Sequence, residues 1–285
     1  MEAKRGTALV TGASSGIGRE TAKKLAEEGF LVIASARRSD RLTELTAQNQ
    51  NILPRPVDLS NAQELESFCQ ELSSLSEPVS VLINDAGFSI RGAVEDVSLV
   101  SIRQVFEVNL FALIRVTQAC LPGMRRLRQG TIVNLSSIIG KFTFPLNSVY
   151  SASKHAVEAI SDGLRMEVRP FGIRVVTIRP GAIATEFNDT ANQLTGDLLS
   201  RTDPDYKPVY HAFGAAMAKL FSTISIPGPE IIANIILEAV LSESPKTVYS
   251  AGPLVEEILG KRTKIDDDAF DRFMTEKAGL EGLKV

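Results

Sequence analysis

The stretch Thr11-Gly12-Ala13-Ser14-Ser15-Gly16-Ile17-Gly18 decides the fold, because it joins a short apolar segment to one with helical periodicity. Glycines lack a Cβ atom, so the backbone can turn sharply and approach a pyrophosphate closely. The N-terminus of the next helix would present free N–H groups and a partial positive charge to phosphates. We therefore predict a phosphate-facing loop, although a turn with a purely structural role could carry the same glycines.

The spacing of the glycines narrows the kind of site. It is Gly-x3-Gly-x-Gly, which differs from G-x-G-x-x-G, and no Lys-Ser/Thr pair follows as in a P-loop. Residues 12–16 also fit G-x-S-x-G, the nucleophile elbow of α/β-hydrolases. That alternative needs an acid and then a histidine downstream, and the chain has only His155 and His211. Little chain precedes this first strand to supply an oxyanion-hole N–H, so we favour a dinucleotide loop.

Strand-like and helix-like segments alternate along the chain on both sides of this loop, as is typical of a parallel sheet with crossover helices. We therefore expect an α/β fold, a Rossmann-type doubly wound sheet of about seven mostly parallel strands with helices on both faces. The expected strands cover residues 7–10, 30–36, a short segment ending at 57, 79–84, 131–135, 173–178 and 247–250.

The expected helices fill the gaps between these strands. They cover 16–28, 40–48, a long region 96–128 that could be two helices in series, and 148–169. Ser60 and Gln63 have the spacing of a capping box, and Pro229 suits the first position of a late helix. We expect one domain over residues 1–285, with an insertion without clear period at about 182–228 and a helical C-terminal extension at about 253–285.

Composition excludes several classes of function. The hydrophobic fraction of 44% and the charged fraction of 23% are ordinary for a soluble globular protein. The net charge of −3 and the absence of a basic patch predict no nucleic-acid partner. The first residues lack the apolar core of a signal peptide, and no apolar run is long enough to span a membrane, so we expect a cytoplasmic protein. Cys69 and Cys120 lack metal-ligand spacing, and we expect buried thiols and no metal.

The residues after the second and third strands indicate which dinucleotide would bind. Arg37 and Arg38 occupy the place where NAD-binding sheets carry an acidic residue for the ribose 2′-hydroxyl. Guanidinium groups suit a 2′-phosphate, so the pair favours NADP(H) over NAD(H), unless both are only solvated surface arginines. Asp58 could accept a hydrogen bond from an adenine amino group, or it could be a turn residue.

Tyr150 and Lys154 are the strongest candidates for chemistry. Four residues apart on a helix, their side chains share one face and can reach one pocket. An ammonium group beside a phenol favours the phenolate, so we expect Lys154 to lower the pKa of Tyr150. A tyrosine tuned in this way can exchange a proton with a hydroxyl or carbonyl group. The pair alone could also be surface decoration, and its weight comes from the segments before it.

Taken together, these segments resemble the short-chain dehydrogenase/reductase family from Thr7 to about Thr185. Asn109, Ser137, Tyr150 and Lys154 match the catalytic tetrad of that family in order and spacing. Ser137 is preferred over Ser136 because it lies thirteen positions before the tyrosine. The resemblance implies that Tyr150 exchanges the proton, Lys154 binds the nicotinamide ribose, Ser137 orients the substrate oxygen and Asn109 holds a water that links Lys154 to solvent.

The resemblance also implies a set of cofactor-binding residues, and it contains one departure from the family pattern. The family usually has Asn-Asn-Ala-Gly after the fourth strand, whereas this chain has Asn84-Asp85-Ala86-Gly87. A carboxylate only accepts hydrogen bonds, so a buried Asp85 would need a rearranged partner or a proton. The implied cofactor-binding residues are Gly12, Ser14, Ser15, Gly16, Ile17, Gly18, Arg37, Arg38, Asp58, Leu59, Asp85, Ala86, Gly87, Tyr150, Lys154, Pro180, Gly181, Ile183 and Thr185.

The implied activity is hydride transfer between NADP(H) and a carbonyl or alcohol substrate. The insertion should cover the substrate pocket, and its content suggests a lipophilic steroid-, retinoid- or long-chain-like compound, although the same side chains could simply pack the insertion onto the core. These side chains are Phe187, Leu194, Leu198, Leu199, Tyr206, Tyr210, Phe213, Met217 and Phe221. A non-catalytic NADP(H)-binding regulator on the same fold is the main alternative. The family resemblance also implies a homodimer or homotetramer.

Overall fold

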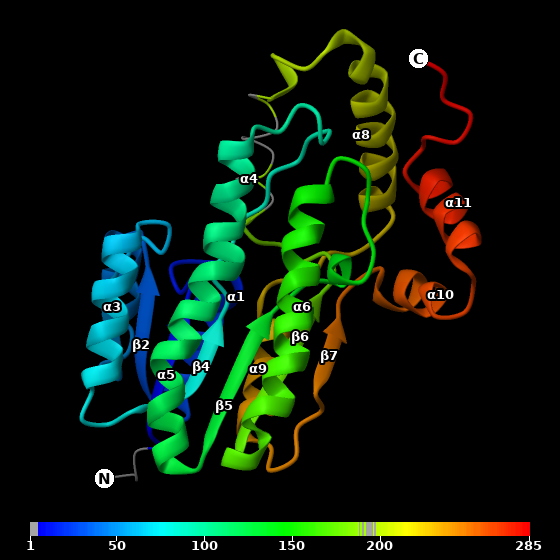
Figure 1. Cartoon of the computed structure of the whole chain (residues 1–285). Coiled ribbons are helices and arrows are strands. Elements are labelled where there is room, and N and C mark those ends of the chain that lie inside the picture. The colour runs from blue at the N-terminus through cyan, green and yellow to red at the C-terminus, as the bar shows by residue number, and fades with distance from the viewer. Residues whose placement is uncertain (1–4, 188, 190, 192–195, 197) are drawn as a thin grey trace.

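The computed structural model describes residues 5–187, 189, 191, 196 and 198–285. Its centre is one sheet of seven strands in the order β3-β2-β1-β4-β5-β6-β7, and every pairing between them is parallel (Figure 1). This confirms the expected Rossmann-type α/β fold. The strands are β1 (Thr7–Thr11), β2 (Leu31–Ala36), β3 (Ile52–Pro56), β4 (Val79–Asn84), β5 (Gly130–Leu135), β6 (Ile173–Pro180) and β7 (Val248–Ala251).

Helices cover both faces of this sheet because its central strands are buried on both sides. One apolar cluster joins the sheet to α1, α2 and α9, and a second joins it to α3, α5 and α6. The helices of the described residues are α1 (Gly16–Glu27), α2 (Ser39–Thr46), α3 (Ala62–Ser74), α4 (Leu99–Phe106), α5 (Leu113–Leu127), α6 (Ser148–Val168), α8 (Lys207–Ser222), α9 (Glu230–Leu241), α10 (Gly260–Arg262) and α11 (Asp267–Lys277). Cys69 and Cys120 lie buried in the second cluster as free thiols, as expected.

The strand order reverses between β1 and β4, and this reversal positions the site. The chain runs outward from β1 to β2 and β3, and then returns to place β4 on the other side of β1. At such a point the loops after neighbouring parallel strands diverge and leave a crevice at the carboxyl ends. The loops that follow β1, β4 and β5 therefore meet at one edge of the sheet.

The long helical region expected at 96–128 is interrupted by a π-helical turn. The segment η1 (Glu107–Ala112) separates α4 from α5 and contains Asn109. The prediction that this region is two helices in series is therefore confirmed, with Asn109 in the irregular turn between them. Such π-turns occur frequently at functional sites.

Two of the expected helix starts differ from the structure by one residue. The N-cap of α3 is Asn61, whose side-chain oxygen accepts hydrogen bonds from the amides of Gln63 and Glu64. The Ser60 hydroxyl donates to Asp58 instead, so the predicted Ser60–Gln63 capping box is wrong. Pro229 caps α9 rather than occupying its first position.

The insertion contains a helix that the sequence did not indicate. α8 lies beyond the carboxyl ends of the strands, beside the C-terminal helices α10 and α11 (Figure 1). The Tyr210 hydroxyl fixes α8 to the segment after β4, because it accepts from the Ala93 amide at 2.8 Å and donates to Asp96 at 2.8 Å. Leu194, one of the residues expected to line a pocket, lies outside the described residues.

A buried ion cluster ties α6 to β6. Glu158 on α6 is buried, and Arg179 on β6 binds both of its carboxylate oxygens at 2.9 and 2.6 Å. Lys141 approaches the same carboxylate at 3.2 Å. Burial alone would raise the pKa of Glu158, but the hydrogen bonds from Arg179 and Ser136 and the two positive charges hold it below its usual range. α6 carries Tyr150 and Lys154, so this cluster fixes the helix of the predicted chemistry.

We expect Arg179→Met to lower the free energy of unfolding by about 3 kcal/mol, because it leaves the Glu158 carboxylate buried with only Lys141 as a cation. The control is Arg115→Met, which breaks an equally bidentate but exposed pair with Glu66. That variant should lose less than about 1 kcal/mol. Denaturant unfolding measures both, and equal losses would contradict the structural role of the buried cluster.

Candidate active site

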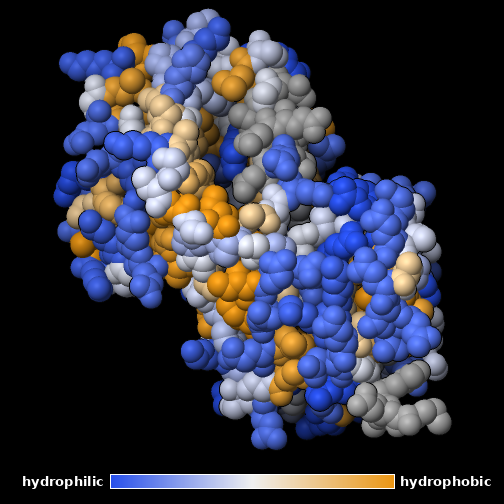
Figure 2. Space-filling view, turned by 180° about the vertical axis from the view of Figure 1, so that it is seen from behind, coloured by the Kyte–Doolittle hydropathy of each residue, from blue (hydrophilic) through white to orange (hydrophobic). Residues whose placement is uncertain are grey.

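A cavity of about 860 Å³ opens at the carboxyl ends of the strands and extends under α8. Figure 2 shows hydrophobic side chains gathered in the hollow between the body of the sheet and the lobe formed by α8 and the C-terminal helices. One end of the cavity holds the glycine loop and the arginines, and the other end is largely apolar. The apolar lining consists of Ile139, Phe144, Leu146, Phe187, Leu199, Phe213, Met217, Phe221, Ile226 and Leu254.

The loop between β1 and α1 has a conformation that requires glycine. Gly12 and Gly16 have positive φ values of 74° and 56°, which L-residues rarely adopt. The side chain of Ser15, the N-cap of α1, makes no capping hydrogen bond to the helix. The first amides of α1 therefore face the cavity without a competing side-chain cap, as an anion site at a helix N-terminus needs.

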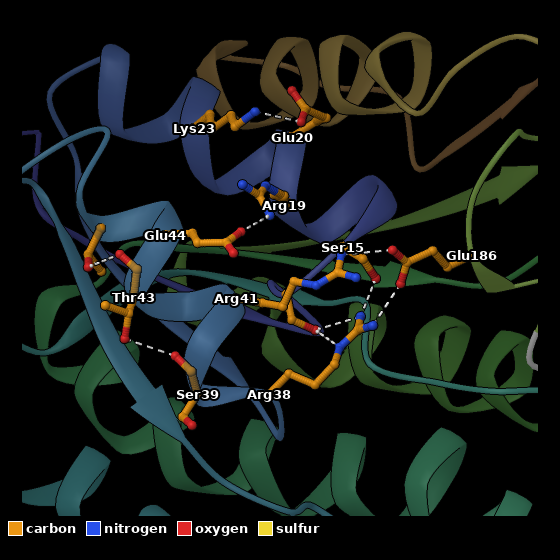
Figure 3. A network of polar contacts seen from close by, with 12 residues as sticks. Ser15, Arg19, Glu20, Lys23, Arg38, Ser39, Arg41, Thr43, Glu44 and Glu186 are labelled. Carbon is orange, nitrogen blue, oxygen red and sulfur yellow. Dashed lines mark hydrogen bonds and ion pairs between the residues drawn. The ribbon is translucent and has the colours of Figure 1, made fainter.

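Arg38 is held at the mouth of this loop by a network of polar contacts (Figure 3). Its guanidinium group donates to the hydroxyls of Ser14 and Ser15 and to the carboxylate of Glu186 at 2.7 Å. Arg41 donates to the other oxygen of Glu186 at 2.8 Å. The network connects the glycine loop to the start of the insertion, and it already holds one anionic group against Arg38.

Tyr150 and Ser137 are brought together at the centre of the cavity. The Ser137 hydroxyl donates a hydrogen bond to the Tyr150 oxygen, and the Phe187 ring lies 5.4 Å from the Tyr150 ring, centroid to centroid. Burial raises the pKa of Tyr150, the charge of Asp85 raises it further, and the contacts with Ser137 and Arg91 only partly oppose this. The sequence predicted a lowered pKa for Tyr150, whereas in this structure the pKa is raised, because burial is the largest effect.

Lys154 is buried beside the tyrosine, one helical turn away. Its Nζ donates to the Leu135 carbonyl at 2.7 Å and lies 5.7 Å from the centroid of the Tyr150 ring. Burial lowers the pKa of Lys154 to about 8, although the charges of Asp85 and Glu158 favour the ammonium form. The side chain is therefore close to the point where it gains or loses its charge at neutral pH.

Asn109 lies behind the cavity wall and braces it from the π-turn. Its oxygen accepts from the Phe88 amide at 3.0 Å, and its nitrogen donates to the Phe88 carbonyl and to Ser153, each at 3.0 Å. A Cβ atom on Gly87 would lie 3.0 Å from the Asn109 oxygen and 3.7 Å from the Lys154 nitrogen. The tetrad residues are therefore neighbours, with Gly87 between Asn109 and Lys154.

Of the two roles that the sequence left open for Asp58, the structure shows the turn residue. Its Oδ1 accepts from the backbone amide and the hydroxyl of Ser60, at 2.9 and 2.7 Å, which makes it a turn residue. It also lines the cavity at the end of β3, where an adenine group could reach it. Burial would raise its pKa, but the two Ser60 hydrogen bonds and the charge of Arg37 lower it.

The cavity contains nearly all of the predicted site residues. Gly18 and Asn109 are the exceptions, because Gly18 lies under the loop and Asn109 behind Gly87. The predicted residues that line the cavity are Gly12, Ser14, Ser15, Gly16, Ile17, Arg37, Arg38, Asp58, Leu59, Asp85, Ala86, Gly87, Ser137, Tyr150, Lys154, Pro180, Gly181, Ile183 and Thr185.

Sequence reasoning missed several polar residues of the cavity. Arg91 lines it half-buried, close enough to Tyr150 for their charges to interact. His211 on α8 also lines it, and Glu186 closes the arginine end. None of them belongs to a motif with fixed spacing, so only the fold brings them to the site.

The residues present fit a dinucleotide. The glycine loop leaves space where Cβ atoms would block it, free amides begin α1, and Arg38 already binds a carboxylate. The cavity is long enough to continue from these groups to Tyr150 and Ser137. Among the described residues, no group of three or more His, Cys, Asp or Glu side chains could hold a metal ion.

Comparisons with known proteins agree with this geometry. Residues 6–195 match the family described as short chain dehydrogenase. The chain is 35% identical over 243 residues to the uncharacterized oxidoreductase YbbO of Escherichia coli, which covers 85% of this chain and 83% of that protein. It is 33% identical over 257 residues to a 3-ketodihydrosphingosine reductase of Bacteroides thetaiotaomicron, covering 89% and 90%.

A solved structure shares the fold over almost the whole chain. It is a short-chain dehydrogenase from Sphingobium yanoikuyae in complex with NADPH, with a TM-score of 0.72 and 25% sequence identity. The match covers 95% of this chain and 96% of the other, so it extends beyond the sheet into the insertion and the C-terminal helices.

We expect Gly18→Ala to destabilise the protein by about 1–3 kcal/mol, as overpacking does. The new Cβ would lie 2.6 Å from the Asp85 carboxylate and 2.6 Å from the Gly12 carbonyl oxygen, so the loop must move. Gly163→Ala on α6 is the control, because its nearest contact would be 3.9 Å away, and alanine favours a helix by up to about 1 kcal/mol. Thermal unfolding compares the two, and an unchanged Tm for Gly18→Ala would contradict the close packing.

Proposed function

The chain belongs to the short-chain dehydrogenase/reductase family and is an oxidoreductase that acts on CH–OH groups, and on this premise we propose that it transfers a hydride between NADP(H) and a lipophilic ketone or secondary alcohol. The observation that carries the proposal is the contact between the Tyr150 and Ser137 hydroxyls inside the cavity that the glycine loop also lines. The α/β-hydrolase alternative is wrong, because the family differs and the Ser14 hydroxyl is bound by Arg38.

The nicotinamide ring supplies or accepts the hydride, and the protein manages the proton. In reduction, the Tyr150 hydroxyl donates its proton to the substrate oxygen, and in oxidation the same oxygen accepts one. A raised pKa keeps the phenol protonated at neutral pH, which suits donation. Ser137 donates to the same oxygen position and orients the carbonyl group towards Tyr150.

Lys154 and Asn109 assist the proton transfer without contacting the substrate oxygen. The Lys154 ammonium stabilises the negative charge that Tyr150 acquires when its proton leaves, because it lies near the ring in a buried environment. Both N–H groups of the Asn109 amide already donate hydrogen bonds, to the Phe88 carbonyl and to Ser153. Asn109 therefore fixes the backbone beside Lys154. A water that replaces the proton would be bound by Lys154 and by backbone oxygens of the π-turn rather than by the Asn109 nitrogen.

A preference for NADP(H) follows from the charges at the arginine end of the cavity. Arg37 and Arg38 line it there, and no acidic residue precedes them at the end of β2. Arg38 already binds the Glu186 carboxylate, and this supports the proposal that Arg38 can also bind a phosphate, which is negatively charged like the carboxylate. The Sphingobium yanoikuyae relative was solved with NADPH.

A lipophilic substrate follows from the apolar end of the cavity beyond Tyr150. Side chains of α8 and of the segment before it form this end, with Phe187 against Tyr150 itself. The Bacteroides thetaiotaomicron relative is named a 3-ketodihydrosphingosine reductase, and a ketone with a long apolar chain is the class of substrate that such a wall would accept. Steroid- and retinoid-like ketones have the same chemistry and belong to the same proposal.

A homodimer or homotetramer is the expected assembly. Exposed apolar side chains on adjacent helical segments support it, namely Phe111 of the π-turn and Ile160 and Met166 of α6. No helix of the described residues is long and apolar enough to cross a membrane. The cytoplasmic location expected from the sequence stays a prediction.

We expect Tyr150→Phe to lower turnover by ~10² or more while NADPH binding persists, because only the proton-transferring hydroxyl is lost. The assay follows NADPH absorbance with a panel of short hydrophilic and long lipophilic ketones and aldehydes. Tyr249→Phe removes a hydroxyl outside the cavity, where it accepts a hydrogen bond from the Lys246 amide, and should keep full turnover. Near wild-type turnover in Tyr150→Phe would refute its role, and tight NADPH binding with no turnover of any compound would favour the regulator.

The cofactor preference is tested by replacing Arg37 and Arg38 with glutamine together. We expect the Kd for NADPH to rise at least about tenfold more than the Kd for NADH, since only NADPH carries the 2′-phosphate. Arg41→Gln is the matched control, because Arg41 shares Glu186 with Arg38 but does not line the cavity. Fluorescence titration gives both constants, and an equal loss for the two dinucleotides would exclude the 2′-phosphate assignment.

A further inference from the structure

Two glycines of the loop, Gly12 and Gly18, pack against a single carboxyl group, that of Asp85. A Cβ atom on Gly18 would lie 2.6 Å from Asp85 Oδ2, and one on Gly12 would lie 3.0 Å from the same oxygen. The Gly18 amide donates a hydrogen bond to this carboxyl group. Asp85 therefore lies directly beneath the loop that faces the phosphates, although its side chain belongs to the end of β4.

The backbone around Asp85 is tied to the same place. The amides of Asp85 and Ala86 both donate to the Thr11 hydroxyl, at 3.2 and 3.1 Å, and Thr11 is the last residue of β1. These bonds fix the carboxyl group relative to the first residue of the loop. Any change in what the carboxyl group accepts or donates is therefore passed to Gly12 and Gly18.

The charges that face Asp85 come from α6. Lys154 attracts the carboxylate, while the Tyr150 phenolate and the carboxylate disfavour each other. From the loop and the start of α1, Gly12 and Gly18 face the carboxyl group, and both are uncharged. Burial raises the pKa of Asp85 to about 7, against the opposing effect of Lys154, so its proton is exchanged near neutral pH.

From this geometry we propose that Asp85 is a positioning residue whose carboxyl group supports the glycine loop and whose charge, set against Lys154, determines how tightly the loop binds an anionic dinucleotide. The inference rests on the proposed function only for the identity of the ligand, a nicotinamide dinucleotide. It goes beyond that function because it makes cofactor affinity depend on a side chain under the loop.

The two protonation states act on the loop in opposite ways. A carboxylate only accepts hydrogen bonds and places a negative charge beneath the position of the cofactor phosphates, which it repels. A protonated carboxyl group removes this charge and can also donate. The Gly12 carbonyl oxygen is the acceptor on the same side of Gly18 as Asp85 Oδ2, since each would lie 2.6 Å from a Cβ atom on Gly18.

The test is the near-isosteric variant Asp85→Asn, which keeps an acceptor for the Gly18 amide and removes the charge. The Kd for NADH is measured by fluorescence titration at about pH 6 and about pH 8, in the wild type and the variant. NADH is the probe because the 2′-phosphate of NADPH titrates near pH 6 itself. We expect the two proteins to bind NADH equally at the lower pH, and the variant to bind about tenfold more tightly at the higher pH.

Asp58→Asn is the matched control. Asp58 also lines the cavity, but its pKa is lowered, so it is ionised at both pH values. The ratio of wild-type to variant Kd should therefore be the same at both pH values for Asp58→Asn and should change only for Asp85→Asn. An equal ratio for Asp85→Asn at the two pH values, or weaker binding at both, overturns the inference and leaves the proposed function intact. If none of the proteins binds NADH or NADPH, both the inference about Asp85 and the proposed function are contradicted.

A second readout needs no cofactor. A carboxyl group whose pKa is raised by folding contributes stability at low pH, below its unfolded value near 4, and this contribution is lost as the pH rises to about 7. The difference in Tm between Asp85→Asn and wild type should therefore increase from about pH 4 to about pH 7 and then stay constant. A difference that is the same throughout would show that Asp85 keeps one protonation state, which contradicts the proposal.

Discussion

The reversal of strand order between β1 and β4 is the constraint on which the rest of the structure depends. Because the two strands are neighbours whose connections leave in opposite directions, their carboxyl ends cannot both be covered by crossover helices. The glycine loop, the Asp85 segment and the Ser137 segment all leave the sheet at this edge. α6 then crosses the sheet beside β5 and adds Tyr150 and Lys154 to the same cavity, held in place by Glu158 and Arg179.

Burial governs the electrostatics of the site once these groups have met. Removing water raises the pKa of Tyr150 and lowers that of Lys154, so both neutral forms are favoured in the absence of a compensating charge. Asp85 is the group that connects them, since its charge favours the Lys154 ammonium and disfavours the Tyr150 phenolate. The glycine loop and the residues proposed to move the proton therefore share one carboxyl group, that of Asp85, as an electrostatic neighbour.

Local patterns were sufficient to predict the sheet, the glycine loop and the grouping of Ser137, Tyr150 and Lys154 in one cavity, because strand alternation and fixed spacings involve residues close together in the sequence. Other features depend on contacts between distant segments. α8, for example, is held by the hydrogen bond between Tyr210 and Asp96. The expected lowering of the Tyr150 pKa failed because spacing gives proximity but not burial. Arg91 and His211 line the cavity, but no sequence pattern predicts their position there.

The central claim is that hydride passes directly between the nicotinamide and the carbon that bears the oxygen next to Tyr150. Its most direct test is isotope transfer from NADPH deuterated at C4, prepared separately with the label on each face of the ring and supplied with a lipophilic ketone that the protein reduces. Mass spectrometry of the alcohol should find the deuterium on the carbinol carbon for one of the two labelled forms only. An unlabelled alcohol from both forms would contradict direct transfer in this cavity.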